Sequence, residues 1–213
     1  MRAANTPERL KEMLVEHAGK RPQIDPSAWI APDATICGDV AIGAGSRVLH
    51  GARMIGESGG SIRIGRYCII MENAVVRSSP RHACSIGDYC LVGPNAHVTG
   101  AQLEDEVFIA TSAAIFHGAH LGHGSEVRVH GTVHLRTRLE PGATVPIGWV
   151  AVGDPARIFA PDQHDEIWTI QKPLNFPDWV YGFDRNTPDL MQHVTRRLSE
   201  KLAGHAGDIV LGA

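Results

Sequence analysis

The stretch "IDPSAWIAPDATICGDVAIGAGSRV", residues 24–48, decides the fold, because a large aliphatic side chain stands at every sixth position. A period of six cannot follow one face of an α-helix, in which 3.6 residues complete a turn. It does suit short strands, where residues an even number apart point to the same face. The period continues along the chain at the following anchor residues: Ile24, Ile30, Ile36, Ile42, Val48, Met54, Ile64, Ile70, Val76, Ile86, Val92, Val98, Leu103, Ile109, Ile115, Leu121, Val127, Val133, Leu139, Val145 and Ala151. Short insertions near residues 56–63 and 78–85 and a slip of one residue at Gln102 interrupt it.

The position four residues after each anchor is mostly occupied by a small side chain. Such a residue fits the interior corner at which a coil turns. These positions hold Ala28, Ala34, Ser46, Ala52, Cys68, Ala74, Cys90, Ala96, Ala113, Ala119, Ser125 and Ala143. The two patterns together predict an all-β solenoid over residues 22–158, a parallel β-helix of about seven three-sided coils in which each coil buries its neighbour.

The two ends of the chain lack this period. Residues 1–21 are expected to form a short N-terminal helical segment, with Thr6 as N-cap, Pro7 at the first helical position and Gly19 as the stop. Residues 159–213 are expected to form a C-terminal helical extension, with helices over 161–171 and 187–205 and an aromatic loop over 175–186 between them. We expect these helices to cover the open end or the side of the solenoid.

Composition excludes several classes of partner. The formal net charge is -3 and there is no run of Lys or Arg, so neither nucleic acid nor a membrane surface is an expected partner. The first twenty residues are charged and lack an apolar core, and no segment approaches the roughly 18 apolar residues of a membrane span. Four cysteines without a CxxC pair indicate no zinc knuckle or redox motif. We predict a cytoplasmic protein.

Three segments carry a resemblance to a known family. The run over residues 24–48, "GSIRIGRYCIIMENAVV" at 60–76 and "VAVGDPARI" at 150–158 resemble the gamma-class carbonic anhydrases and their relatives. The resemblance covers roughly residues 22–158. It implies that the β-helix is left-handed, that it assembles as a homotrimer, and that active sites lie between subunits, where three histidines hold zinc.

The chain departs from this family at the zinc ligands. In the family, one histidine follows a pair of aliphatic residues, a position that falls here on Arg77. The other two belong to an element that matches "LVGPNAHVTG", residues 91–100, where they fall on Pro94 and Thr99. Proline offers no ligand, threonine a poor one, and a guanidinium is always charged. We therefore expect no metal and no cofactor at the inherited position, and a zinc carbonic anhydrase is the disfavoured interpretation.

The repeat also predicts which side chains are neighbours at that position. Arg77, Thr99 and His97 should form one outward patch on adjacent rungs, about 4.8 Å apart. Glu57, Glu72 and His50 should lie nearby, the last two brought round by a neighbouring subunit. The expected catalytic residues are His97, Glu72 and Arg77, and the expected substrate-binding residues are Arg53, Arg77, Thr99, Glu57 and His50.

Two interpretations of this patch stay open. In one, the arginines bind a small anionic or carboxylated metabolite while His97 and Glu72 exchange protons. In the other, Arg77 pairs with Glu57 or Glu72 and fills the vacated space as an interface salt bridge. A metal site displaced toward His117 and His134 has little support, since most histidines of that region occupy different faces.

Three classes of function follow. The first is a metal-independent enzyme of the gamma-carbonic-anhydrase-like group that catalyses a hydration, dehydration or lyase step. The second, nearly level with it, is a non-catalytic scaffold or binding trimer. The third is an acyl-CoA-dependent acyltransferase, which ranks lower because the long loop inserted in that family is missing.

Overall fold

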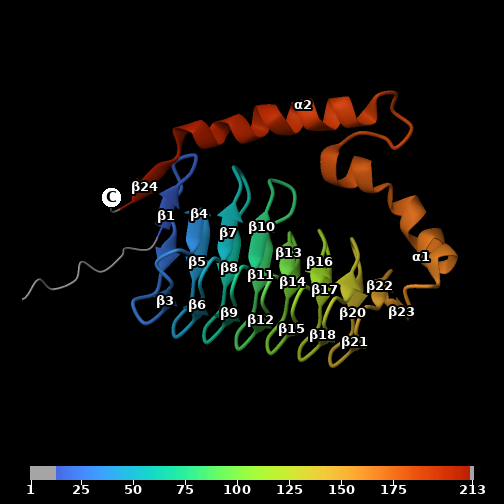
Figure 1. Ribbon diagram of the computed structural model, residues 1–213, viewed down its shortest axis with the longest axis horizontal. Helices are drawn as coiled ribbons and strands as arrows, with labels where there is room; N and C mark the ends of the chain where they lie inside the picture. Colours follow the sequence, from blue (N-terminus) through green and yellow to red (C-terminus); the bar gives the residue numbers. More distant parts are fainter. Residues whose placement is uncertain (1–12, 212–213) are drawn as a thin grey trace, which may run out of the picture.

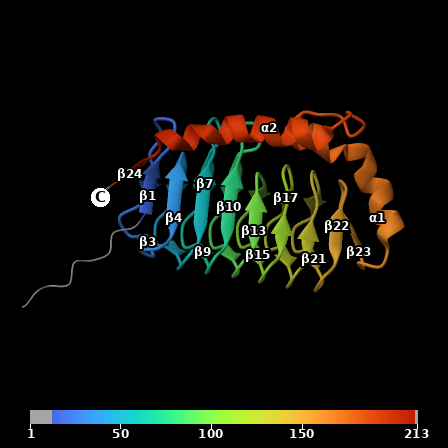
Figure 2. The same ribbon diagram turned by 45° about the horizontal axis from the view of Figure 1, so that its top comes forward.

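The computed structural model describes residues 13–211 as a left-handed parallel β-helix with a helical extension at its C-terminal end (Figure 1). Three sheets run along the stack, and each coil contributes one short strand to each sheet. Figure 2 shows the coils lying side by side from β1 to β22. The predicted fold class is therefore confirmed.

The first sheet has ten strands, of which eight run parallel and the two at its edges run antiparallel to their neighbours. In spatial order these strands are β23 (Arg157–Phe159), β22 (Val150–Val152), β19 (Thr132–Val133), β16 (Ala114–Ile115), β13 (His97–Thr99), β10 (Val75–Ser78), β7 (Arg53–Gly56), β4 (Thr35–Gly38), β1 (Met13–Glu16) and β24 (Ile209–Leu211). The parallel part makes about eight rungs. That is one more than the repeat predicts, because β1 adds a rung before the first repeat.

The other two sheets have seven strands each. One contains β2 (Gln23–Ile24), β5 (Val40–Ile42), β8 (Ile62–Ile64), β11 (Cys84–Ile86), β14 (Gln102–Leu103), β17 (His120–Leu121) and β20 (Arg138–Leu139). The other contains β3 (Trp29–Ile30), β6 (Arg47–Val48), β9 (Ile69–Ile70), β12 (Leu91–Val92), β15 (Phe108–Ile109), β18 (Glu126–Val127) and β21 (Thr144–Val145). The inserted segments lie between β7 and β8 and between β10 and β11.

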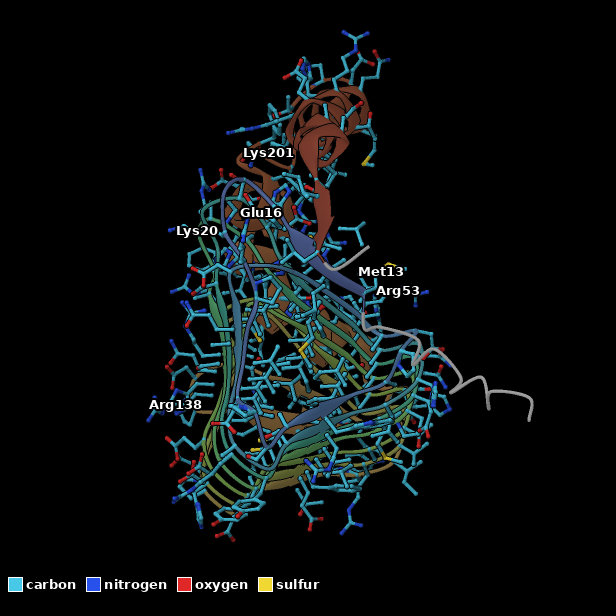
Figure 3. All side chains as sticks on the ribbon, turned by 90° about the vertical axis from the view of Figure 1, so that its left-hand side faces the viewer. Met13, Glu16, Lys20, Arg53, Arg138 and Lys201 are labelled. Atoms are coloured by element: carbon cyan, nitrogen blue, oxygen red, sulfur yellow. The ribbon has the colours of Figure 1, made fainter. Side chains whose placement is uncertain are left out.

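The anchors of the repeat form the core. Every anchor after Ile24 is at most 5% exposed, and Ile24 is only partly buried because it belongs to the first complete coil. The small residues four positions later are buried at the corners, apart from Ala28 and Ala143 near the two ends, which are partly buried. Seen along the stack, the coils enclose side chains, while Arg138 and Lys20 project outward (Figure 3). Burial of one aliphatic side chain per repeat is the main stabilising term.

The predicted N-terminal helix is wrong where the structure describes it. Met13–Glu16 is strand β1, which pairs with β4 on one side and with β24 on the other. Gly19 does not stop a helix but lies with Ala18 in a two-residue turn, where both φ angles are positive and an antiparallel bridge joins His17 and Lys20. Pairing with β4 buries Val15, and this contact outweighs local helix propensity. Thr6 and Pro7 lie outside the described residues.

The C-terminal extension contains the two predicted helices. Helix α1 (His164–Gln171) covers the end of the stack, where Ile167 packs with Val152 and Phe159. Helix α2 (Leu190–Leu202) runs back along the side of the β-helix (Figure 1). Its inward face includes Val194, which is 2% exposed. Among residues 13–211, no helix has the length and apolar character needed to cross a membrane.

Three short helical turns complete the extension: η1 (Lys172–Leu174), η2 (Pro177–Tyr181) and η3 (Ala203–Gly207). The aromatic loop expected over 175–186 contains η2, whose Trp179 ring stacks on the guanidinium of Arg136 at 4.7 Å. After η3 the chain forms β24 beside β1. Strand β24 was not predicted, and it brings the C-terminal segment to the first rungs of the β-helix.

Candidate functional site

Strands β7, β10 and β13 place the predicted patch on one outward surface. The register pairs Arg77 with Ile55 on one side and with Thr99 on the other, as the repeat predicts. The hydroxyl of Thr99 is hydrogen-bonded to Nε2 of His97, two residues earlier on the same strand. These three side chains share a surface because they occupy two adjacent parallel rungs. The predicted neighbourhood of Arg77, Thr99 and His97 is present in the structure.

The guanidinium of Arg77 already has a partner within the chain. Its Nη2 donates to Oε1 of Glu57, which lies in the loop after β7. The other oxygen of Glu57 contacts Nε2 of His205 at 3.3 Å. The side chain of Arg77 is 38% exposed while that of Glu57 is 17% exposed. An arginine has five N–H donors, so the bond to Glu57 leaves further donors on a side chain that is partly exposed.

Several histidines around this patch are held in the neutral form. Desolvation by the surrounding protein, followed by the charge of Arg77, lowers the pKa of His97, although the residue as a whole is exposed to solvent. Burial lowers the pKa of His117 to about 4, with further contributions from His82, His97 and Arg77. Burial alone lowers the pKa of His134 to about 4. A neutral imidazole at neutral pH can accept a proton, which is the property of a general base.

The insertion between β10 and β11 adds a residue that sequence reasoning missed. His82 lies with its ring centroid 5.2 Å from that of His117 and 5.3 Å from that of Trp179. Gly100 permits this approach, since a Cβ added there would lie 2.5 Å from Cβ of His82, and its φ of +53° favours glycine. The sequence could not reveal the contact with Trp179, because it depends on how the extension docks.

Seven buried side-chain polar atoms have no hydrogen-bond partner among the described residues, and two of them, His117 Nδ1 and Trp179 Nε1, belong to the rings beside His82; Ser78 Oγ and His134 Nδ1 are two others. Buried polar groups are normally paired, so each of these atoms could accept or donate a hydrogen bond to a group that the single chain does not supply. His117 and His134 do not join any set of three or more potential ligands within residues 13–211. The structure therefore adds no support for a metal site displaced toward them.

Three of the predicted residues do not reach Arg77 within one chain. His50 is exposed and its Nδ1 lies 2.6 Å from Asp33 Oδ1. Arg53 donates through Nη1 to the carbonyl oxygen of Gly51 at 3.0 Å. Within residues 13–211, no hydrogen bond or ion pair joins Glu72 to Arg77. Their roles in the site stay predictions, and for His50 and Glu72 these depend on a neighbouring subunit.

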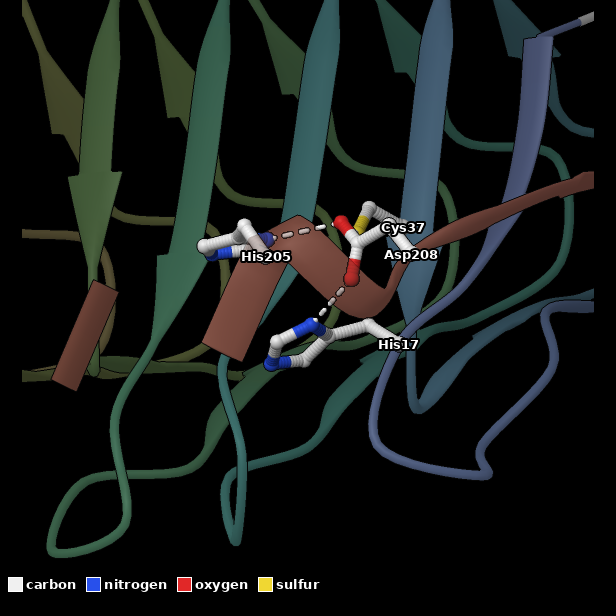
Figure 4. Close-up of side chains that lie close together, drawn as sticks. All are labelled: His17, Cys37, His205 and Asp208. Atoms are coloured by element: carbon white, nitrogen blue, oxygen red, sulfur yellow. Dashed lines mark hydrogen bonds and ion pairs between the residues drawn. The ribbon is translucent and has the colours of Figure 1, made fainter. Parts of the chain in front are cut away.

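A second polar cluster lies where the C-terminal segment meets the first rungs (Figure 4). The carboxylate of Asp208 lies between two imidazoles, with His17 Nδ1 at 2.6 Å from Oδ1 and His205 Nδ1 at 2.8 Å from Oδ2. The thiol of Cys37 donates to Oδ2 at 3.8 Å. The two imidazole rings are stacked with centroids 4.2 Å apart. Glu57 joins this cluster to Arg77 through His205.

The ionisation of this second cluster excludes a nucleophilic cysteine. Burial, followed by the charge of Asp208, raises the pKa of the Cys37 thiol to about 12. A reactive cysteine needs the thiolate, which this environment disfavours in the absence of a cation. The hydrogen bond with Asp208 raises the pKa of His205, and Glu57 adds to the effect. Sequence reasoning missed the cluster because His17 and Asp208 are 191 positions apart.

The fold and the repeat define a hexapeptide-repeat β-helix protein, and comparison with known proteins agrees. No model of a known protein family matches the chain. The chain is 31% identical over 154 residues to gamma carbonic anhydrase 1, mitochondrial, of Arabidopsis thaliana, covering 70% of this chain and 54% of the relative. It is 28% identical over 160 residues to a carbonic anhydrase of Geobacillus kaustophilus, covering 75% of this chain and 84% of the relative.

A solved structure shows the same fold. It is a UDP-N-acetylglucosamine acyltransferase from Bacteroides fragilis with a TM-score of 0.57 and 15% identity, covering 89% of this chain and 90% of the other. At that identity the likeness concerns the fold alone. The chain spans about half the length of the Arabidopsis relative. The chain is thus similar in sequence to gamma carbonic anhydrases, and its fold is the left-handed β-helix built from hexapeptide repeats.

Proposed function

We propose that this protein is a metal-independent enzyme that binds a small carboxylated metabolite between the subunits of a homotrimer. The reaction is a hydration, dehydration or lyase step: in the direction of elimination, a base takes a proton from the carbon next to the carboxylate, a double bond forms, and the leaving group departs from the adjacent carbon with a proton from an acid, while addition is the reverse. The observation that carries the proposal is that a neutral imidazole, His97, and a partly exposed guanidinium, Arg77, lie on adjacent rungs of one surface. The same proposal includes a cytoplasmic location.

The residues present do not fit the zinc ion that the family implies. A zinc hydrase needs three neutral imidazoles that leave one position open for water. The corresponding positions hold Arg77, Pro94 and Thr99, and Arg77 is paired with Glu57. A fixed positive charge repels a divalent cation at short range. No step of the proposed reaction therefore uses a metal at this position.

The remaining groups have complementary tasks. The outward N–H groups of Arg77 would bind the carboxylate of the substrate through charge-assisted hydrogen bonds. His97 would accept a proton from the neighbouring carbon, and the hydrogen bond with Thr99 Oγ1 orients its ring. His50 and Glu72 would come from the adjacent subunit. Arg53 would add positive charge at the rim, one column from Arg77.

A non-catalytic trimer is the second candidate, and one observation favours it. Arg77 already forms an ion pair with Glu57, whose other oxygen is occupied by His205. In a non-catalytic trimer, Arg77 would fill the space that zinc-binding histidines occupy in the family. Its ion pair with Glu57 would hold the loop after β7 against the sheet. An acyltransferase is a third possibility, to which the structure adds only the shared fold.

Binding and proton transfer can be tested separately. The unmodified protein is titrated calorimetrically with bicarbonate, acetate, succinate and citrate, and we expect one of them to bind. Arg77→Gln should weaken that binding at least tenfold. Arg66→Gln is the matched control, since Arg66 also pairs with one carboxylate, that of Asp88, but on another surface. Absence of binding by all four probes, or equal loss in both variants, would favour the non-catalytic trimer.

Whichever of acetate, succinate and citrate binds is then incubated with the protein in D2O, and exchange of the carbon-bound hydrogen next to its carboxylate is followed by NMR. His97→Ala should slow this exchange by roughly a hundredfold or more while leaving the binding constant within a few fold, because general bases contribute about 10²–10⁴ to a rate. His120→Ala is the control, since His120 pairs with Glu104 on a different sheet. Exchange that is unchanged in His97→Ala would remove His97 from the mechanism.

A further inference from the structure

The cluster of His17, Cys37, His205 and Asp208 has the composition of a metal site. Each side chain offers one ligand atom, and the four atoms all lie within 4.8 Å of one another. A tetrahedral zinc site with bonds of about 2.0–2.3 Å needs its ligand atoms roughly 3.3–3.8 Å apart. The cluster therefore requires only small side-chain movements to enclose an ion. Zinc would replace the two hydrogen bonds that Asp208 now makes to the imidazoles.

We propose that these four residues form a structural binding site for zinc or a similar divalent transition metal, distinct from the inherited position at Arg77. Thiolate and imidazole ligands together select this class of metal over Mg²⁺ and Ca²⁺, which prefer oxygen. Four protein ligands leave no open coordination position, which is typical of a structural site. The proposal departs from the sequence-based expectation that the chain holds no metal, and it does not depend on the proposed function.

The surroundings of the cluster support a metal site independently of its composition. A metal-bound histidine usually donates its other ring N–H to a carboxylate, which fixes the orientation of the ring. Here Nδ1 of His205 faces Asp208, while its Nε2 lies 3.3 Å from Oε2 of Glu57. Glu57 is itself held by Arg77. The second shell that a metal-binding His205 needs is thus already in place.

The cluster is buried but accessible from one side. His17 is 3% exposed and Cys37 is 4% exposed, whereas the side chains of His205 and Asp208 are 30% and 19% exposed, so an ion would be shielded from water on the side of the β-helix and reachable from the side of the extension. A cleft of about 270 Å³ adjoins the cluster, with His17 and Glu57 in its lining. This cleft offers a path along which an ion could enter. A metal site in a folded protein requires a complete set of ligand atoms and a path by which the ion can enter.

An ion at this position would join segments that are distant in sequence. His17 follows β1 and Cys37 belongs to β4, whereas His205 lies in η3 and Asp208 directly precedes β24 (Figure 4). The extension also contacts the first rungs through β24, whose Ile209 and Val210 are more than half exposed, and through the contact of His205 with Glu57. Linking the ends of a long segment restricts the unfolded chain and stabilises the docked extension. The metal would therefore act as a clamp on the C-terminal segment.

Cobalt is a suitable probe, because Co²⁺ bound by a thiolate gives a charge-transfer band that a site made of nitrogen and oxygen lacks. The full chain is stripped with a chelator and titrated with Co²⁺, and then with Zn²⁺ as competitor. We expect one equivalent of Co²⁺ per chain, with a thiolate band that Zn²⁺ abolishes. An unmodified protein that shows no thiolate band overturns the proposal, whatever its total metal content.

Variants locate the site. Cys37→Ala should abolish the thiolate band, and Asp208→Asn should weaken Co²⁺ binding at least tenfold. Glu57→Gln should weaken it by about 10–100-fold through the orientation of His205. Cys84→Ala is the matched control, since Cys84 is another buried thiol, 1% exposed and outside the cluster. A band that survives in Cys37→Ala, or that disappears equally in Cys84→Ala, would refute the assignment. If a variant does not fold, the thiolate band in the cobalt spectrum of the unmodified protein still tests whether the chain binds a metal through a cysteine.

Discussion

The partly buried imidazole of His134 should make the protein sensitive to moderate acid. His134 follows β19, its ring lies 5.8 Å from that of Phe116, and its Nδ1 has no hydrogen-bond partner among residues 13–211. Burial lowers its pKa to about 4, whereas an unfolded chain takes up the proton near its ordinary value of about 6.5. Stability from this residue is therefore present at neutral pH and is lost as the pH falls from 6.5 toward 4.

The size of the effect follows from these two values. Between them lie about 2.5 pH units, which correspond to roughly 3 kcal/mol of unfolding free energy once the pH is below both. At pH 5, where the unfolded chain is almost fully protonated and the folded one is not, the loss is about 2 kcal/mol. We expect His134→Leu to remove this part of the pH dependence. At neutral pH the variant should be at least as stable, because a polar atom without a partner is removed.

The measurement is urea unfolding from pH 7.5 to 4.5 at one fixed protein concentration. The free energy of unfolding of His134→Leu should fall less steeply than that of the unmodified protein, by about 2 kcal/mol at pH 5. His123→Leu is the matched control, since the His123 side chain is 56% exposed, and its profile should follow that of the unmodified protein. Parallel profiles for His134→Leu and the unmodified protein would refute the reasoning.

Four further predictions concern assembly and the inherited site. Arg77→Ala should keep the trimer and lower the free energy of unfolding by only about 1–2 kcal/mol, because Glu57 retains His205 as a partner. Loss of the trimer would instead show that the ion pair between Arg77 and Glu57 stabilises the subunit interface. His97→Ala should leave the melting temperature unchanged, and a fall of several degrees would indicate a packing role. Light scattering at micromolar concentration should give a trimer, and a monomer would contradict this. Thr99→Ala should leave the zinc content unchanged, whereas a loss would place an ion at the inherited position.

The neighbours of Arg77 could be predicted because the repeat converts sequence distance into spatial distance. Once each anchor is assigned to the core, the residue after it must project outward beside the corresponding residue of the next rung. This reasoning placed Thr99 beside Arg77 correctly. It could not indicate the partner of a flexible side chain, and it left open whether Glu57 or Glu72 pairs with Arg77. The structure shows Glu57, since the insertion after β7 carries this residue to the guanidinium.

The N-terminal segment shows where local signals fail. A capping residue, a proline and a glycine at suitable spacing indicate a helix, yet Met13–Glu16 is a strand. Helix propensities differ by only a few tenths of a kcal/mol per residue, while pairing with β4 buries Val15 and continues the sheet. The extension helices were predicted more accurately because α2 shows Leu190, Val194 and Leu198 on one face.

The sequence by itself determined the β-helix, its core and the outward columns of its faces, because a period of six leaves each coil no other way to bury its aliphatic residues. Tertiary structure alone decided the cluster of His17, Cys37, His205 and Asp208. His17 and Cys37 belong to the first rungs, whereas His205 and Asp208 belong to the segment that follows helix α2. No periodic pattern relates them, since the extension returns along the whole β-helix and docks through β24. The contacts made by that return path depend on the folded shape, and local sequence carries no signal for them.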